Sequence, residues 1–264
     1  HESVVQLLLK NGADVNAEGG QYGNALQAAS AAGSRSVVQL LLDHGAVVNA
    51  QGGFHDNALQ AAAFAGSESI VNLLLEREAE LNAQGGYYGS ALQAAASRGN
   101  GSVVQLLLEC KVDVHAQGGR YGNALQAAAA VGSEPIVQLL LNHGVEVNAQ
   151  GGYHGSALQA AAFAGNQSVV KLLLKHNAKL NAQGGYYGSA LQAAVARGNR
   201  SVVELLLEHK ADLNSKSGRF DSALQAAVAR RNEPIARLLL KNGADVNSLL
   251  ARYGTALSAA VHGR

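Results

Sequence analysis

Short runs of small and apolar residues alternate with polar, glycine-rich segments along the whole chain, and the alternation keeps a fixed period. Ala-Leu recurs at residues 25, 58, 91, 124, 157, 190, 223 and 256, and every interval is 33 residues. The triplet Leu-Leu-Leu recurs at the same interval, from residue 7 to residue 238. A fixed period of this size is typical of solenoids, in which each unit buries its apolar face against its neighbours. We therefore expect residues 1–264 to form a single all-α solenoid of about eight 33-residue repeats.

Residues 85–117 illustrate the fold expected of one repeat. Residues 85–89, Gly-Gly-Tyr-Tyr-Gly, predict a turn, because glycine readily adopts positive φ. Ser90 and Gln93 have the spacing of a capping box, in which the Gln side chain is expected to reach back to the cap. Residues 91–98 then predict a short helix whose alanines allow neighbouring backbones to approach closely. The same cap position recurs in the other repeats, as Asn24, Asn57, Asn123, Ser156, Ser189, Ser222 and Thr255.

A second and more apolar helix is expected in each repeat. In the repeat above, Gly99 ends the first helix and Asn100 is the next N-cap. Residues 103–108 have the apolar spacing of a buried helix, which we expect to stop near residues 109–111. The only two prolines of the chain fall in the first turn of this helix, where proline is tolerated: Pro135 and Pro234.

The aromatic residues are confined to three positions of the repeat. One turn position is aromatic or His in every repeat, which we interpret as packing between neighbouring turns. The position before it varies among Gln, Phe, Tyr and Arg, and two positions at the end of the first helix vary as well. Variation within an otherwise uniform repeat indicates that packing does not dictate the residue, and aromatic and Arg side chains are common interface anchors. We therefore expect these positions to bind a partner: Phe54, Phe64, Tyr87, Arg98, Arg120, Tyr153, Phe163, Tyr186, Arg197, Arg219, Arg230 and Arg252.

Composition and charge indicate the cellular location and the class of partner. Cys110 is the only cysteine, which fits a reducing compartment. No segment approaches the roughly 18 apolar residues of a membrane span, and no signal-peptide layout opens the chain, so we expect a cytoplasmic protein without a membrane partner. The net charge of +1 disfavours a general polyanion binder. Residues 133–264 hold 14 Lys/Arg and 8 Asp/Glu, which leaves nucleic-acid binding as a weaker alternative.

No pattern for catalysis or metal binding stands out. The Gly-Gly-x-Tyr-Gly turn follows no apolar strand and lacks the spacing of phosphate-binding motifs. His143, His176 and His209 share one position of the repeat, but we expect equivalent positions in stacked repeats to lie about 10 Å apart. Ligands of one metal ion must all lie about 2 Å from it. We therefore expect no enzyme activity, no cofactor, no metal and no small-molecule substrate.

The repeat resembles the ankyrin repeat. A turn, a small-residue helix, a glycine and a Val-Leu-Leu-Leu helix are followed by Gly-Ala-Asp-Val-Asn, as at residues 243–247. Most ankyrin repeats begin the first helix with Thr-Pro-Leu-His, whereas this chain has Asn/Ser-Ala-Leu-Gln, as at residues 156–159. The combination Gly-Gly-x-Tyr-Gly-Ser-Ala-Leu-Gln-Ala-Ala is similar to the ankyrin arrays of filamentous fungi, which often follow a nucleotide-binding switch domain in receptors. The chain also begins and ends within a repeat, which we interpret as an excerpt from a longer array.

The resemblance implies that the chain binds another protein or peptide, through the concave groove that turn tips and first helices form in ankyrin folds. The expected site residues are aromatic in the middle of the chain and Arg-rich toward its C-terminus, so a partner with apolar anchors and acidic groups would complement them. The alternative interpretation is a structural spacer or a designed, consensus-like scaffold, which the near-identical repeats favour.

Overall fold

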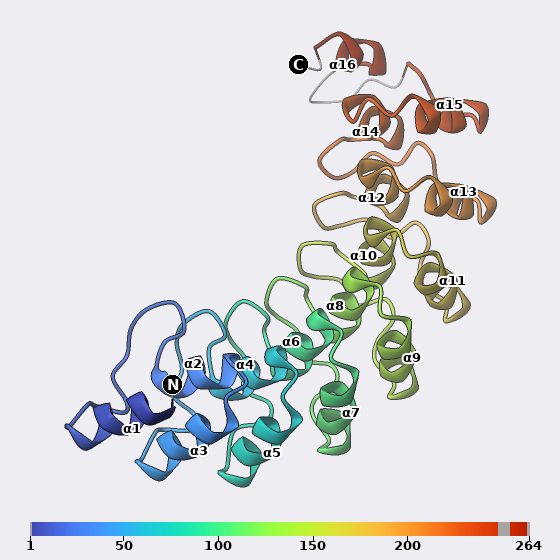
Figure 1. Ribbon diagram of the computed structural model, residues 1–264. Helices are drawn as coiled ribbons and strands as arrows, with labels where there is room; N and C mark the ends of the chain where they lie inside the picture. Colours follow the sequence, from blue (N-terminus) through green and yellow to red (C-terminus); the bar gives the residue numbers. More distant parts are fainter. Residues whose placement is uncertain (1, 248–253, 263–264) are drawn as a thin grey trace. The chain divides into compact units, whose positions relative to one another are not determined.

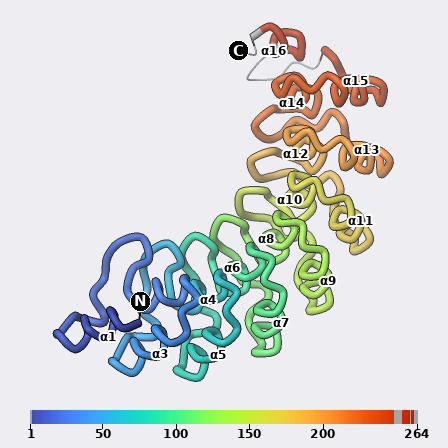
Figure 2. Tube along the Cα trace, viewed as in Figure 1, coloured from blue at the N-terminus to red at the C-terminus, as the bar shows by residue number. Residues whose placement is uncertain are grey.

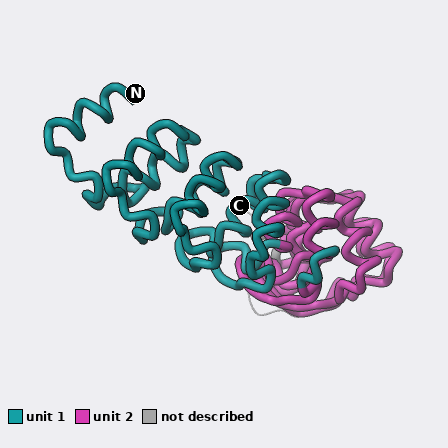
Figure 3. Tube along the Cα trace, turned by 90° about the horizontal axis from the view of Figure 1, so that it is seen from below, with its two compact units in different colours: residues 1–124, 142–145 teal, residues 125–141, 146–264 magenta. Residues whose placement is uncertain are grey.

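The computed structural model describes residues 2–247 and 254–262. The chain divides into two compact units, residues 1–124 with 142–145 and residues 125–141 with 146–264, which we call unit 1 and unit 2 (Figure 3). Every regular element in the described part of the chain is a helix. In chain order these are α1 (Glu2–Lys10), α2 (Ala25–Ala31), α3 (Arg35–Asp43), α4 (Ala58–Ala65), α5 (Glu68–Glu76), α6 (Ala91–Arg98), α7 (Gly101–Glu109), α8 (Ala124–Val131), α9 (Glu134–Asn142), α10 (Ala157–Ala164), α11 (Gln167–Lys175), α12 (Ala190–Arg197), α13 (Arg200–Glu208), α14 (Ala223–Ala229), α15 (Glu233–Lys241) and α16 (Ala256–His262).

In each unit the helices form two layers (Figure 1). In unit 1 the first helices α2, α4 and α6 pack side by side, and the second helices α3, α5 and α7 form the other layer. Unit 2 repeats this arrangement with α10, α12 and α14 against α11, α13 and α15. The core lies between the layers: α6 packs against α7, and Leu92 of α6 and Val103 and Leu107 of α7 are all fully buried. The expected all-α solenoid fold of 33-residue repeats is confirmed.

The N-caps predicted for the first helices are confirmed at seven positions. The Asn24 side chain accepts a hydrogen bond from the N–H of Gln27 at 2.9 Å, and Thr255 accepts one from the N–H of Ser258 at 3.2 Å. Gly99 ends α6 in the left-handed conformation, and α7 stops where the sequence predicts. The same side-chain cap forms at five other helices, from Asn57, Ser90, Ser156, Ser189 and Ser222.

The Gln side chain of the expected capping box does not reach back to the cap, and this part of the prediction is wrong. In α6, Nε2 of Gln93 instead donates to the carbonyls of Gly118 and Gly122 in the next turn, each at 3.0 Å. The bond to Gly122 is buried and the bond to Gly118 is half-buried, so the Gln amide supplies a donor where water has little access. Oε1 lies so close to Gly89 that a Cβ there would be 2.8 Å away. The same amide bridge to the next turn forms from Gln27, Gln126, Gln159 and Gln192.

The turns themselves are joined by backbone hydrogen bonds. The N–H of Tyr87 donates to the carbonyl of Phe54 at 3.0 Å, and that of Arg120 donates to the carbonyl of Tyr87 at 2.8 Å. In unit 2 the N–H of Tyr186 donates to the carbonyl of Tyr153 at 2.8 Å. The expected spacing of about 10 Å between equivalent positions is therefore wrong for the turns, because they touch backbone to backbone without side chains between them. Figure 2 shows the turns of unit 1 as a row of loops beside α2, α4 and α6.

A second side-chain amide joins the loops that follow the second helices. Nδ2 of Asn49 donates to the carbonyl of Glu78 at 3.0 Å, and its Oδ1 accepts the N–H of Glu80 at 2.8 Å. Asn148 makes the same pair of bonds in unit 2. Where both amides are present, they attach a repeat to the next one at both ends of its helix pair, through part-buried or buried bonds from Gln and exposed bonds from Asn.

We expect the Gln bridge to be required for stability. Gln159→Glu removes both donors and places a carboxylate beside the carbonyls of Gly184 and Gly188, which Nε2 now contacts at 3.0 and 2.6 Å. The free energy of unfolding should fall by about 3 kcal/mol or more, since one buried and one half-buried acceptor lose their partner and a carboxylate takes its place. Urea denaturation measures the change, and Gln183→Glu, at an exposed Gln of the same unit, is the control. Equal stability of the two variants would contradict the role of the bridge.

The contact between turns also predicts a strict requirement for glycine. Gly119 has φ of 59°, and a Cβ there would lie 2.3 Å from the carbonyl carbon of Tyr88. Gly119→Ala should therefore cost about 3 kcal/mol of unfolding free energy, from the left-handed backbone and the steric clash together. Gly45 has φ of 86° with open space around it, so Gly45→Ala should cost only about 1 kcal/mol. Thermal and urea unfolding compare the two, and similar losses would show that the turns do not constrain each other.

Candidate partner-binding site

Unit 1 gathers the expected site residues of its turns and first helices into one group of side chains, which we call cluster 1. It takes residues from three successive repeats, because the hydrogen-bonded turns bring equivalent positions close together. Its rings lie at the tips of the turns and at the C-terminal end of α4. The members are Phe54, His55, Phe64, Tyr87, Tyr88, Arg98 and Arg120.

The constant turn position forms a column of stacked rings, as the sequence predicts. Tyr22 stacks on His55 with ring centroids 6.5 Å apart, His55 on Tyr88 at 5.8 Å, and Tyr88 on Tyr121 at 6.5 Å. His55 and Tyr88 are buried. This column is the floor on which the variable side chains rest.

The variable turn position forms a second and more exposed column. Phe54 and Tyr87 stack with centroids 4.6 Å apart, and the Arg120 guanidinium lies over the Tyr87 ring at 5.7 Å. Phe54 keeps 37 % of its surface exposed. Stacked rings have few alternative rotamers, so this apolar surface is held in one conformation.

Phe64, at the end of α4, connects the floor to a cation. Its ring lies 4.9 Å from those of both His55 and Tyr88, and the Arg98 guanidinium lies over it at 4.8 Å. Nδ2 of Asn100 donates to the carbonyl of Phe64 at 2.9 Å. Asn100 occupies the expected N-cap position, but its side chain does not cap α7, because it bonds to the preceding repeat instead. The prediction of a side-chain cap at Asn100 is wrong.

Unit 2 contains the same arrangement 99 residues later, which we call cluster 2. Tyr153 stacks on Tyr186 at 5.0 Å, and Phe163 stacks on Tyr187 at 4.8 Å. The Arg197 guanidinium lies over Phe163 at 4.9 Å. Arg219 lies over the Tyr186 ring at 5.3 Å and donates to its hydroxyl. The members of cluster 2 are Tyr153, His154, Phe163, Tyr186, Tyr187, Arg197 and Arg219.

The structure thus places the expected site residues in two groups. Cluster 1 holds five of them, Phe54, Phe64, Tyr87, Arg98 and Arg120, and cluster 2 holds Tyr153, Phe163, Tyr186, Arg197 and Arg219. Arg230 lies beside cluster 2, with its guanidinium 5.6 Å from the centroid of the Phe220 ring. Arg252 lies outside the described residues.

The sequence analysis did not predict that the site residues form two equivalent clusters. It also did not predict that the His55 and Tyr88 rings pack against the Phe64 ring in cluster 1. A signal was available, because residues 52–65 and 151–164 agree in the aromatic turn, the His and the late Phe. Comparison at an interval of 99 residues, rather than 33, reveals it. Each unit carries one copy of the block.

Burial keeps the floor of cluster 1 uncharged. His55 is 4 % exposed and its Nδ1 has no hydrogen-bond partner within the described residues, so desolvation lowers the pKa of this His below 6.5. Desolvation also raises the pKa of Tyr88 to about 12. Both rings are therefore neutral at pH 7, and the charge of the cluster is carried by the arginines above them.

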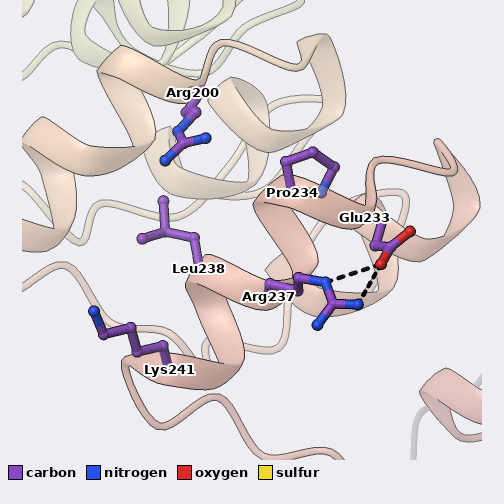
Figure 4. A pocket seen from close by; sticks show the side chains of 6 residues that line it. All are labelled: Arg200, Glu233, Pro234, Arg237, Leu238 and Lys241. Atoms are coloured by element: carbon purple, nitrogen blue, oxygen red, sulfur yellow. Dashed lines mark hydrogen bonds and ion pairs between the residues drawn. The ribbon is translucent and has the colours of Figure 1, made fainter.

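A cavity on the second-helix layer offers less to a partner. It has a volume of about 570 Å³ and is lined by side chains of α13 and α15 (Figure 4). Both of its arginines are already paired within the protein, because Arg237 pairs with Glu233 and Arg200 pairs with Glu204. Elsewhere in the described residues no group of His, Cys, Asp or Glu side chains could hold a metal ion. None of the described helices is long and apolar enough to cross a lipid bilayer.

The fold and the paired helices define a helical repeat protein, and the comparisons identify the family. A family model described as ankyrin repeats (3 copies) matches residues 1–85, 92–184 and 183–250. The chain belongs to the ankyrin repeat family. The structure is similar to the human ASB11 ankyrin repeat domain, with a TM-score of 0.69 and 23% sequence identity over 84% of this chain and 99% of that one. This likeness concerns the fold alone. No curated protein matches the sequence.

Burial of His55 predicts a pH dependence of stability. Because its pKa is lower in the folded state than the unfolded value of 6.5, the unfolded chain binds more protons below that pH. The free energy of unfolding should therefore fall as the pH drops from 7 to about 5, and His55→Tyr should reduce the slope. Tyr occupies this position in most repeats. Urea unfolding across the pH range measures the slope, and an unchanged slope in the variant would contradict the assignment.

Proposed function

We propose that the chain is a non-enzymatic recognition module that binds a protein or peptide through cluster 1 and cluster 2. Ankyrin repeats are generally protein–protein interaction modules, and no enzyme family emerges from the comparisons. The observation that supports this surface is the stack of ordered, partly exposed rings beneath arginines. Phe54 and Tyr186 each keep 37 % of their surface exposed in an otherwise closely packed turn.

The proposed mechanism is binding to a pre-organised surface. The rings already stack on one another and the arginines already lie over the rings, so few side chains lose conformational freedom when a partner binds. An apolar side chain of the partner would contact the exposed column of rings. Acidic groups of the partner would pair with the guanidinium groups above.

Two finer points of this proposal rest on the sequence. The turn and first-helix motif resembles fungal arrays, which supports a role as the sensor array of a fungal receptor. The lone Cys110 supports a cytoplasmic location. A structural spacer is the second candidate, favoured by the amide bridges that join successive repeats without regard to the variable residues.

Replacing the exposed rings tests the proposal. A partner is first isolated by selection from a peptide display library against the whole chain, and its Kd is measured by calorimetry. Tyr87→Ala, Tyr153→Ala and Tyr186→Ala should together weaken binding by about ten-fold or more, which is about 1.4 kcal/mol. The melting temperature should change little, because these rings lie outside the core between the helix layers.

The control is Val47→Ala, which truncates an exposed apolar side chain outside both clusters. It should leave the affinity unchanged. Undiminished affinity in the triple Tyr variant would overturn the assignment of the clusters, and failure to select any partner with the whole chain would favour the spacer.

A further inference from the structure

We infer that unit 2 carries a pocket for an oxyanion, a carboxylate or phosphate group on a peptide, at the edge of cluster 2. The inference rests on the proposed function and names the acidic group that the partner would present. The pocket has a volume of about 310 Å³ and draws on three successive repeats. Its lining includes Phe163, Tyr187, Arg197, Gly198, Arg230 and Asn232.

The two arginines leave the pocket with uncompensated positive charge. No acidic side chain lines it. Neither Arg197 nor Arg230 forms an ion pair with a carboxylate in the described part of the chain. Both are exposed. An oxyanion entering the pocket would therefore meet two guanidinium groups without displacing an internal partner.

Aromatic rings hold both guanidinium groups in place. Arg197 lies over Phe163 at 4.9 Å, and Arg230 lies over Phe220 at 5.6 Å. A guanidinium over a ring face can still donate hydrogen bonds from its edge, and its planar fork matches a carboxylate or phosphate. Stacking also reduces the side-chain entropy lost on binding. The two arginines are thus ordered before a ligand arrives.

Asn232 adds a third donor. Its Oδ1 accepts the N–H of Ile235 at 3.1 Å and so fixes the amide, whereas its Nδ2 makes no hydrogen bond within the described residues. The equivalent Asn199 differs, because its Nδ2 donates to the carbonyls of Ala162 and Phe163. The free amide N–H of Asn232 beside two guanidinium groups is the donor set that an oxyanion uses.

The floor of the pocket favours an oxyanion attached to an apolar group. Phe163 is half-buried and Tyr187 is buried, so both present ring surface beneath the arginines. An aromatic or aliphatic group next to the anion would cover that surface. The ligand class is therefore an acidic peptide group with an apolar neighbour, rather than an isolated inorganic ion.

Small probes test the pocket on the whole chain. N-acetylphenylalanine carries a carboxylate and a ring, N-acetylphenylalaninamide lacks the charge, and phenyl phosphate carries a phosphate monoester. Titrations are followed by NMR through the Nε–H resonances of Arg197 and Arg230, at constant ionic strength. We expect saturable shifts with the acid, with a Kd about ten-fold lower than that of the amide. The ratio of the Kd values for acid and phenyl phosphate then shows which oxyanion the pocket prefers.

The variants locate the binding. Arg230→Val installs the residue that the chain has three repeats earlier, Val131, and should bring the Kd of the acid close to that of the amide. Arg237→Gln removes an arginine of the same unit that is paired with Glu233 outside the pocket, and should leave the ratio unchanged. Melting temperatures confirm that both variants are folded.

Equal affinity for the acid and the amide would overturn the pocket, and so would a preference for the acid that survives Arg230→Val. The outcome is separable from the test of the proposed function. If the chain binds the acid through Arg230 but selects no peptide partner, the pocket is supported and the proposed function is contradicted. If binding of a selected partner depends on Tyr153 and Tyr186, but the chain binds the acid and the amide equally, the proposed function is supported and the pocket is contradicted.

Discussion

The buried Gln amide near the start of the first helices α2, α6, α8, α10 and α12 is the interaction on which the rest of the structure depends. A Gly-rich turn exposes carbonyls that must be satisfied once the next repeat covers them. Nε2 of Gln93 satisfies two of them at once, and Gly89, the residue before the cap, leaves room for the rest of the amide. Since the donor belongs to one repeat and the acceptors to the next, a repeat is complete only when its neighbour is present.

This linkage sets the geometry of the candidate site. Turns that are held by backbone bonds and by the Gln bridge stand close enough for their side chains to stack, as Phe54 and Tyr87 do at 4.6 Å. The side chains at the tips carry none of these bonds. Recognition and stability therefore use different atoms of the same turn, which explains how Gln, Phe, Tyr and Arg can all occupy one position of the repeat.

Local rules predicted most of the fold, because periodicity, caps and turns depend on neighbouring residues. The period of 33 residues gave the helix pairs, and Ser or Asn at the caps gave their starts. The predictions failed where a side chain had two partners to choose from. Gln93 and Asn100 both bond to another repeat rather than to their own helix, and sequence spacing within a repeat cannot rank those alternatives. The variable positions were found from their variation, but the His55 and Tyr88 contacts required coordinates.

The recurrence of one cluster after 99 residues has a consequence for how such a chain changes over time. A block of three repeats carries its own floor, rings and arginines, and the repeats at its ends are joined to their neighbours through the same kind of Gln donor and turn carbonyl. Duplication or exchange of a block by recombination would therefore preserve the stack while copying or replacing a whole recognition surface. Diversity in such an array can accumulate by shuffling intact modules as well as by point substitution.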